Sequence, residues 1–466
     1  MHQVAHRATV IWARYQGMCR MALSKPFEAS AWFGLCLISS ALAAPAESLA
    51  PMLDKVLPGV VSVIVTMAPP DQGQDPPHAP FFSQFFEQPQ SQDQPEQGFG
   101  SGVIIDAAGG LILTNAHVVQ DVSAITVRLN DGREAEARVL GTDTATDIAV
   151  LKIKLDGLTG IPIGRSAEVR VGDGVVAVGD AFGLDQTVTS GIVSALNRND
   201  LGIEDYEDFI QVDANISSGN SGGPLVDMQG AMVGINTAIL QPDGGSTIGF
   251  AIPADMAMLV AQELIAHGKM NHGAIGARLQ DLTPQLAKAL KLTGHSGALV
   301  TAILPDSPAQ SVGLRPGDLV ISANGVAVTS GSLHTIIGMS VAGTRLRLGL
   351  IRDGIGLTID VVLGPRESIA LRQSIWPDHE DGILAPNLNG VVLSDAPAYG
   401  TKIAGVRVDG VQKGKVGGLM TGDVIVQVNG APTPNTVTLA KELAETDPPQ
   451  VLQVYRQNQV IFVVIW

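Results

Sequence analysis

A single serine stands between glycines in the segment GNSGGPL at residues 219–225, a setting that can turn a hydroxyl group into a nucleophile. Attack on a peptide carbonyl needs an exposed Oγ and backbone N–H groups that face the oxygen as it becomes negative, and glycines let the chain turn tightly enough. Glycine-rich turns that contain serine are common, so an ordinary hairpin turn is the alternative for this segment alone. Ser221 is therefore a candidate nucleophile whose partners must come from other segments.

Two upstream segments supply such partners. His117 lies in LTNAHVV between two apolar runs, and Asp147 lies in TATDIAVLKI. Each could be an ordinary residue, but the chain order His, Asp, Ser is that of chymotrypsin. We expect His117 to take the proton of Ser221 while Asp147 holds the imidazole tautomer. We expect the N–H groups of Gly219 and Ser221, on a turn shaped by Asn220, to form the oxyanion hole, and this chemistry needs no metal and no cofactor.

These motifs resemble those of the HtrA/Deg family, specifically its Do-like periplasmic serine endoproteases with two PDZ domains. The matching segments are SLAPMLDKVLPGVVSV from residue 48, GFGSGVIID from 98, TNAHVV from 114, TDIAVLKI from 146, TVTSGIVSALNR from 187, GNSGGPLV from 219, and GINTAI with GFAIP ending at 253. The resemblance implies ATP-independent cleavage of misfolded or unfolded envelope proteins, C-terminal peptides as PDZ ligands, and a homo-oligomer made of trimers or their multiples.

The same resemblance assigns further residues. Ile216, Ile239 and Leu240 correspond to walls of a specificity pocket for small aliphatic side chains, although core packing fits them equally well. Arg198 corresponds to the sensor arginine that relays an occupied PDZ site, and a solvent-facing arginine is the alternative. His272 stands near the first PDZ ligand loop where the family often has arginine, so we expect peptide binding there to weaken as the pH rises.

Length and composition favour several mainly β domains. At 466 residues the chain suits about three domains, and 45% hydrophobic with only 4% aromatic residues predicts cores of Val, Ile, Leu and Ala. We predict a chymotrypsin-like double six-stranded β-barrel over residues 45–268, closed by a helix over 254–267. On that helix Met256, Leu259, Val260 and Leu264 fall on one face.

An internal repeat follows the predicted barrels. GLRPGDLVISANG at 313–325 recurs as GLMTGDVIVQVNG at 418–430, and the pattern resembles PDZ domains, predicted at 271–366 and 380–466 with a linker at 367–379. Strand turns are the alternative for their ligand loops. The loops predicted to hold a peptide carboxylate on backbone N–H groups are Ala274, Ile275, Gly276 and Ala277 in the first copy, and Leu388, Asn389, Gly390 and Val391 in the second.

The first 44 residues read as a secretory signal, with basic residues before a short apolar stretch and a small-residue end, which predicts a periplasmic protein without a stable membrane anchor. Cys19 and Cys36, the two cysteines, both lie within it.

A net charge of −16 argues against nucleic acid as a partner. Residues 68–98 are Pro- and Gln-rich yet contain four phenylalanines, so they are a regulatory loop by resemblance or, alternatively, a disordered insertion.

Parts of the sequence also suggest three other classes of protein. A proteolytically silent chaperone, or holdase, on the same scaffold would keep the PDZ pair and treat the triad as a relic. A nucleotide-binding protein would use GFGSG at residues 98–102, but strand-like residues follow it instead of a phosphate-holding helix. A membrane-tethered relative with one PDZ domain is disfavoured by the repeat and by the short apolar leader.

Overall fold

The computed structural model describes most of the chain after residue 47. The described residues are 48–67, 97–180, 186–199, 201–217, 219–240, 248–370, 388, 391–396, 404–411, 418–446, 449–456 and 459–465. The predicted signal segment, both cysteines, the four phenylalanines of the 68–98 loop, and most of the predicted linker lie outside these ranges. No helix in the described ranges has both the length and the apolar character needed to cross a membrane.

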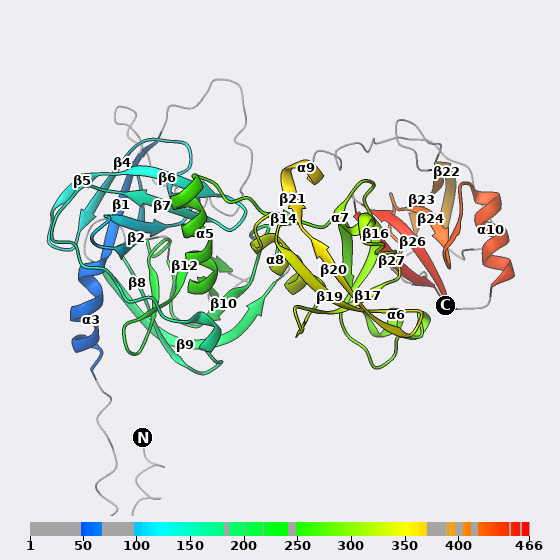
Figure 1. The fold of residues 1–466 in the computed structure, drawn as a ribbon, viewed down its shortest axis with the longest axis horizontal. Coiled ribbons are helices and arrows are strands. Elements are labelled where there is room, and N and C mark those ends of the chain that lie inside the picture. The colour runs from blue at the N-terminus through cyan, green and yellow to red at the C-terminus, as the bar shows by residue number, and fades with distance from the viewer. Residues whose placement is uncertain are drawn as a thin grey trace, which may run out of the picture. The chain divides into compact units, whose positions relative to one another are not determined.

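The first body is a seven-stranded antiparallel sheet in the order β5-β4-β1-β2-β3-β7-β6 (Figure 1). Its strands are β1 (Val60–Met67), β2 (Gln97–Asp106), β3 (Leu111–Thr114), β4 (Val122–Leu129), β5 (Glu134–Glu136), β6 (Arg138–Asp143) and β7 (Ile148–Lys152). Its core is aliphatic, as the composition predicts, and includes Val63, Ile104, Ile112 and Leu151, all fully buried. The predicted six strands become seven because the short β5 pairs with β4 at the edge.

The second body is a closed six-stranded barrel in the order β10-β13-β12-β11-β8-β9. Its strands are β8 (Gly174–Gly179), β9 (Thr187–Arg198), β10 (Phe209–Val212), β11 (Pro224–Asp227), β12 (Met232–Leu240) and β13 (Ile248–Pro253). Closure removes the unpaired edges that an open sheet would expose. Together with the first sheet this confirms the predicted trypsin-like architecture.

Helix α5 (Ala254–His267) follows β13 and packs against β6, β7 and β12 (Figure 1). Its bounds match the predicted run because Gly268, with φ of 75°, ends the helix in the left-handed region that glycine adopts freely. The predicted buried face is only partly right. Val260 and Leu264 are buried, but Leu259 is 39% exposed, and alanines complete the buried stripe.

The repeated segment folds into two sheets of the same topology. The first has the order β15-β16-β17-β19-β20 with β18 on β17, and the second has β22-β23-β24-β26-β27 with β25 on β24; we call them the first and second PDZ sheets. Their strands are β15 (Ala277–Asp281), β16 (Ala298–Ile303), β17 (Leu319–Ala323), β18 (Val326–Ala327), β19 (Arg345–Arg352) and β20 (Ile355–Val362), then β22 (Val391–Ala396), β23 (Gly405–Val411), β24 (Val424–Val428), β25 (Ala431–Pro432), β26 (Gln450–Arg456) and β27 (Gln459–Ile465).

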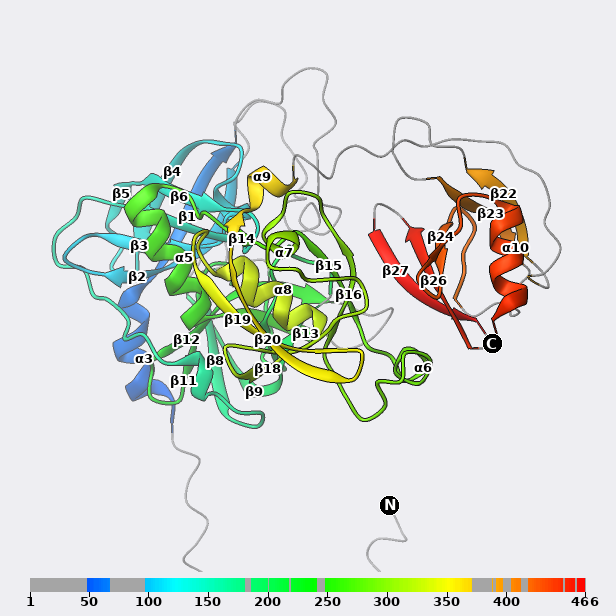
Figure 2. The ribbon, with the colours of Figure 1, turned by 45° about the vertical axis from the view of Figure 1, so that its right-hand side comes forward.

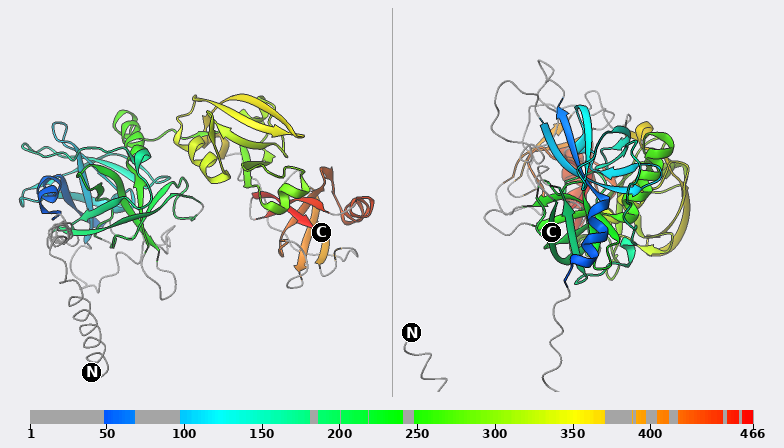
Figure 3. Two further views of the ribbon diagram at one scale, coloured as in Figure 1. Left: turned by 90° about the horizontal axis from the view of Figure 1, so that it is seen from below. Right: turned by 90° about the vertical axis from the view of Figure 1, so that its left-hand side faces the viewer.

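Short elements complete the described chain. They are α3 (Ala50–Val56), η1 (Leu57–Gly59), η2 (His117–Val119), η3 (Ser166–Glu168), the pair β14 (Gly273–Ala274) and β21 (Gly364–Pro365), α6 (Pro284–Ala289), α7 (Pro308–Ser311), α8 (Ser330–Met339), α9 (Arg366–Ala370) and α10 (Thr436–Glu445). Figure 2 shows α10 beside β22, β23 and β24, and Figure 3 shows the curved β19–β20 hairpin. The caps of α8 and α10 are side chains of Thr329 and Asn435, each accepting a backbone N–H bond.

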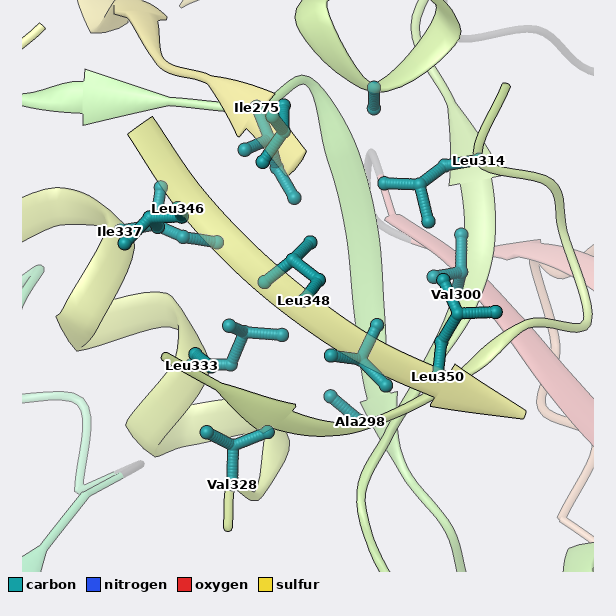
Figure 4. Packing of buried hydrophobic residues seen from close by; sticks show 14 of the residues in the cluster. Ile275, Ala298, Val300, Leu314, Val328, Leu333, Ile337, Leu346, Leu348 and Leu350 are labelled. Carbon is teal, nitrogen blue, oxygen red and sulfur yellow. The ribbon is translucent and has the colours of Figure 1, made fainter. Parts of the chain in front are cut away.

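Alternate residues of β19 fill the core of the first PDZ sheet. Leu346, Leu348 and Leu350 point inward toward Val300 of β16 and Leu333 of α8 (Figure 4). The period of two is what a half-buried strand requires. This core holds α8 against the sheet, and α8 borders the groove described below.

The repeated Gly-Asp motif marks a buried ion pair in both sheets. Asp318 is 1% exposed, and its carboxylate accepts hydrogen bonds from Arg352 Nε and Nη2, each at 2.6 Å. Asp423 and Arg456 repeat the arrangement at 2.7 Å. The bond from Asp318 raises the pKa of the Arg352 guanidinium. The aspartate of the motif therefore has a structural role. It joins the start of β17 to the end of β19 in the first sheet, and the start of β24 to the end of β26 in the second.

Replacing Arg352 with methionine should leave the buried carboxylate of Asp318 without its charged partner. Loss of one member of a buried pair is strongly destabilising, by about 3 kcal/mol or more. We expect amides of β16, β17 and β19 to exchange hydrogen faster in this variant, as measured by mass spectrometry on the full chain. The control is Arg347→Met, which breaks an exposed pair with Asp360 and should change exchange little. Equal protection in both variants would contradict this assignment.

Candidate active site

The imidazole of His117 is held by the carboxylate of Asp147. His117 Nδ1 lies 2.8 Å from Asp147 Oδ2, and the backbone N–H of His117 donates to Asp147 Oδ1 at 2.9 Å. Asp147 is 3% exposed and has φ of 57°, a left-handed conformation that the shortest polar side chains tolerate best. With Oδ2 facing Nδ1, the ring carries its proton on Nδ1 and leaves Nε2 able to accept one.

The backbone of Asp147 is fixed from the same segment as His117. The Asp147 carbonyl accepts hydrogen bonds from Ala116 N–H at 3.2 Å and from Asn115 Nδ2 at 3.0 Å. These donors follow β3, and Asp147 precedes β7, which pairs with β3. Adjacent antiparallel strands thus bring together two residues that are far apart in the sequence.

Thr237 was not predicted, and it connects the nucleophile to this pair. Its hydroxyl donates to Asp147 Oδ2 at 2.7 Å, and its carbonyl accepts a long hydrogen bond from Ser221 Oγ at 3.5 Å. Thr237 is 1% exposed in β12, within the segment GINTAI already matched by motif. A hydroxyl inside that matched strand was the available signal, but its direction depends on the barrel.

Ser221 sits on a tight turn before β11. It is 3% exposed, and Gly222 after it has φ of 84°; a Cβ at Gly222 would lie 2.3 Å from the Ser101 carbonyl oxygen. No residue with a side chain could adopt this turn without moving a neighbouring strand. The turn thus lies against β2 and β3 of the first sheet, next to Ser101 and Thr114.

The predicted oxyanion residues lie on this turn. Asn220 is fully buried, its N–H donates to the Ser217 carbonyl at 2.8 Å, and its Nδ2 lies 3.4 Å from the Asn215 carbonyl. Asn220 is thus anchored into the preceding loop. The roles of Gly219 and Ser221 as oxyanion donors stay predictions.

The predicted specificity pocket is only partly described. Ile216 is 2% exposed and belongs to the core of the closed barrel, where its side chain packs against Gly249. Ile239 and Leu240 lie in β12, and their side chains fall outside the described part. The described contacts of Ile216 are those of core packing, and the pocket stays a prediction.

An acidic loop, residues 201–208, folds around one carboxylate. Glu207 is 5% exposed and accepts hydrogen bonds from the N–H groups of Leu201 and Ile203, both at 2.6 Å, and of Glu204 at 3.1 Å. The loop is thus closed by a side chain of its own. Its neighbour Tyr206 donates its N–H to the Ala145 carbonyl at 3.0 Å, between Asp143 and Asp147 in sequence.

Glu204 in this loop has an unusual proton affinity. Burial raises its pKa to about 9, and the negative charges of nearby carboxylates add to the effect, those of Asp147, Asp205, Glu207 and Asp143. At neutral pH the group is therefore a neutral acid. The acidic loop places a proton-binding group within the electrostatic reach of the Asp147 carboxylate.

His272 differs from our expectation. Its ring is buried, with Nδ1 2.7 Å from the Gly338 carbonyl and Nε2 2.8 Å from Asp143 Oδ1. The ring is thus turned to α8 and to the segment that leads to Asp147, not to a peptide carboxylate. Arg198, the predicted sensor, donates from Nε to Gln211 Oε1 at 2.9 Å across the β9–β10 pair.

The first predicted ligand loop borders a cavity of about 510 Å³. Ala274 to Ala277 line it together with β15 and α8, including Ile337. Gly276 has φ of 73°, and a Cβ there would lie 2.4 Å from Ser307 Cβ, so glycine is required. In the second loop Leu388 and Val391 are buried, and the Val391 N–H donates to the Leu388 carbonyl at 2.9 Å; Asn389 and Gly390 fall outside the described residues.

In the described part of the chain, no group of three or more His, Cys, Asp or Glu residues could hold a metal ion. The described arrangement contains a carboxylate, an imidazole with a fixed tautomer and a serine on a glycine turn. Such a set can perform nucleophilic attack on a carbonyl.

Comparison with known proteins agrees with this chemistry. The trypsin-like peptidase domain family matches residues 100–235, and the PDZ domain family matches residues 273–363. The periplasmic pH-dependent serine endoprotease DegQ of Escherichia coli (strain K12) is 42% identical over 431 residues, which cover 91% of this chain and 92% of DegQ. The periplasmic serine endoprotease DegP of the same strain is 38% identical over 455 residues, 92% of this chain and 94% of DegP.

Solved structures give the same result. The HtrA-type protease AlgW with tripeptide is 38% identical, covers 69% of this chain and 98% of its own, and has a TM-score of 0.57. AlgW with decapeptide is 37% identical, covers 69% and 99%, and has a TM-score of 0.54. On sequence, fold and site, the chain belongs to the HtrA-type serine endoproteases, the family of DegQ and DegP.

Proposed function

We propose that the protein is an ATP-independent protease that cleaves misfolded or unfolded proteins of the cell envelope, with His117, Asp147 and Ser221 as its catalytic triad. The observation that carries the proposal is the 2.8 Å contact of Asp147 with His117 Nδ1, together with Thr237, which touches both Asp147 and Ser221. In this mechanism His117 Nε2 takes the Ser221 proton, and Ser221 Oγ attacks the carbonyl carbon of the substrate. His117 then gives the proton to the leaving amine, and water hydrolyses the acyl-enzyme.

The negative oxygen of the tetrahedral intermediate would be met by the N–H groups of Gly219 and Ser221. One such donor is worth roughly 3 kcal/mol in the transition state. Apolar walls at Ile216, Ile239 and Leu240 would favour a small aliphatic side chain before the cut, because they offer no partner to a charged one.

Peptide binding is proposed for the first PDZ groove. The cavity beside Ala274 to Ala277 would hold the C-terminal carboxylate of a peptide on backbone N–H groups, while the peptide adds a strand beside β15. A tripeptide and a decapeptide accompany AlgW in its structures, which fits a peptide-responsive protease. The second PDZ copy is proposed either to bind peptide or to mediate assembly.

The location is inferred from the names of the relatives, and the assembly from the family resemblance. DegQ and DegP are named periplasmic, and residues 1–44 would direct this chain across the inner membrane before removal. We propose a trimer or a multiple of trimers, with Arg198 and residues 68–98 as regulatory segments. Chaperone action by the same protein, without cleavage, is the second candidate, favoured by the PDZ pair alone.

A pH response is proposed for the acidic loop, and DegQ carries the words pH-dependent in its name. The folded-state pKa of Glu204, about 9, exceeds its ordinary value of 4.5. The stability contributed by its proton is therefore complete below about pH 4.5 and is lost as the pH rises through about 9.

Replacing Ser221 with alanine should abolish cleavage of an unfolded protein. We expect wild type to convert reduced and alkylated lysozyme to fragments without ATP, as followed by mass spectrometry, and Ser221→Ala to give none. The exposed Ser190→Ala variant is the matched control and should cleave normally. Fragments from Ser221→Ala would refute the assignment, and fragments from neither protein would favour the holdase.

Replacing Glu204 with glutamine should flatten the pH dependence of stability. Glutamine keeps the neutral shape of the protonated acid, so both proteins should behave alike near pH 5. Toward pH 9 the parent should lose urea stability relative to Glu204→Gln, measured in the Ser221→Ala background to prevent self-cleavage. The exposed Glu136→Gln variant is the control and should run parallel to the parent. Parallel curves for Glu204→Gln as well would show that the acid is not buried as a neutral group.

A further inference from the structure

The GFGSG segment places a serine next to the turn that carries Ser221. Its Ser101 lies in β2 of the first sheet and is fully buried. Ser62 of β1 lies opposite it in the strand pair and is 1% exposed. These two buried serines are paired on adjacent strands, but their hydroxyl groups bind different partners.

Every polar group of Ser101 is used. Its N–H donates to the Ser221 carbonyl at 2.8 Å, and its hydroxyl donates to the Gly219 carbonyl at 2.6 Å. The same hydroxyl accepts the Asp180 N–H at 2.7 Å, and the Ser101 carbonyl accepts the Thr114 hydroxyl at 2.7 Å. Ser101 thus binds the carbonyl on each side of Asn220.

The catalytic turn is also packed directly around Ser101. A Cβ at Gly179 would lie 2.9 Å from Ser101 Oγ, one at Gly222 would lie 2.3 Å from its carbonyl oxygen, and one at Gly223 would lie 3.1 Å from its Cβ. Three glycines therefore let Ser101 approach the turn. Peptide units are planar, so the bonds to the carbonyls of Gly219 and Ser221 fix the planes on both sides of the Asn220–Ser221 unit. They therefore limit how the Ser221 N–H of that unit can rotate.

We propose that Ser101 is a positioning residue of the protease reaction: from the first sheet it fixes the turn of Gly219 to Ser221, and so orients the Ser221 N–H, one of the two proposed oxyanion donors. The inference rests on the proposed function of Ser221. Ser101 itself does not touch the substrate, since its groups all bind the protein. Ser62 gives its hydroxyl to the Asp180 carboxylate and is not bonded to the turn in the described structure.

The test compares Ser101→Ala with Ser62→Ala. We expect Ser101→Ala to lower kcat for fluorescein-labelled casein about 10-fold or more with KM within about twofold, because the donors act in the transition state. The rate at which diisopropyl fluorophosphate phosphorylates Ser221 with loss of fluoride, measured by mass spectrometry, should fall by a similar factor. Ser62→Ala should change both rates little, while thermal unfolding midpoints of the two variants fall alike.

Equal losses of both rates in the two variants, or unchanged rates in Ser101→Ala, would overturn the proposal. If Ser101→Ala does not fold, Ser101→Cys and Ser62→Cys replace the pair; a thiol is a weaker donor, and only Ser101→Cys should lose kcat. If diisopropyl fluorophosphate does not modify Ser221 of the wild type, the proposed function itself fails. If the reagent modifies Ser221 of the wild type, and kcat and the modification rate are equal in all variants, only the role of Ser101 is rejected.

Discussion

The buried carboxylate of Asp147 is the constraint on which the rest of the site depends. It accepts three hydrogen bonds, two from His117 at 2.8 and 2.9 Å and one from the Thr237 hydroxyl at 2.7 Å. A buried carboxylate without such donors would be costly, so the sheet and the barrel that supply them must stay packed around Asp147. The position of the His117 imidazole thus depends on the packing of the fold around Asp147.

The segment from Asp143 to Asp147 carries this constraint outward. Asp147 holds His117 at one end, and Asp143 binds His272 at the other. The carbonyl of Ala145 between them accepts the Tyr206 N–H of the acidic loop. His272 and the acidic loop are therefore both bonded to the short segment that ends at Asp147.

Much of this could be predicted from sequence because it is encoded locally. Features of this kind can be recognised in short stretches of sequence. They are the segments that carry the histidine, aspartate and serine, the glycines around Ser221, the repeated Gly-Asp motif and the bounds of α5. Thr237, Ser101 and the partner of His272 could not be predicted, because each binds a residue far away in sequence. Their partners depend on which strands become neighbours and on their register. The buried face of α5 was only partly predicted because alanines, weak as hydrophobic signals, complete its stripe.

We propose above all that Ser221 forms a covalent acyl-enzyme with the help of His117. The most direct test is a stopped-flow measurement with p-nitrophenyl acetate, followed by mass spectrometry of the quenched protein. We expect a burst of about one nitrophenol per chain and an acetyl group on the peptide that contains Ser221, with no burst from His117→Ala. A burst of the same size from His117→Ala, or an acetyl group on another residue, would contradict it.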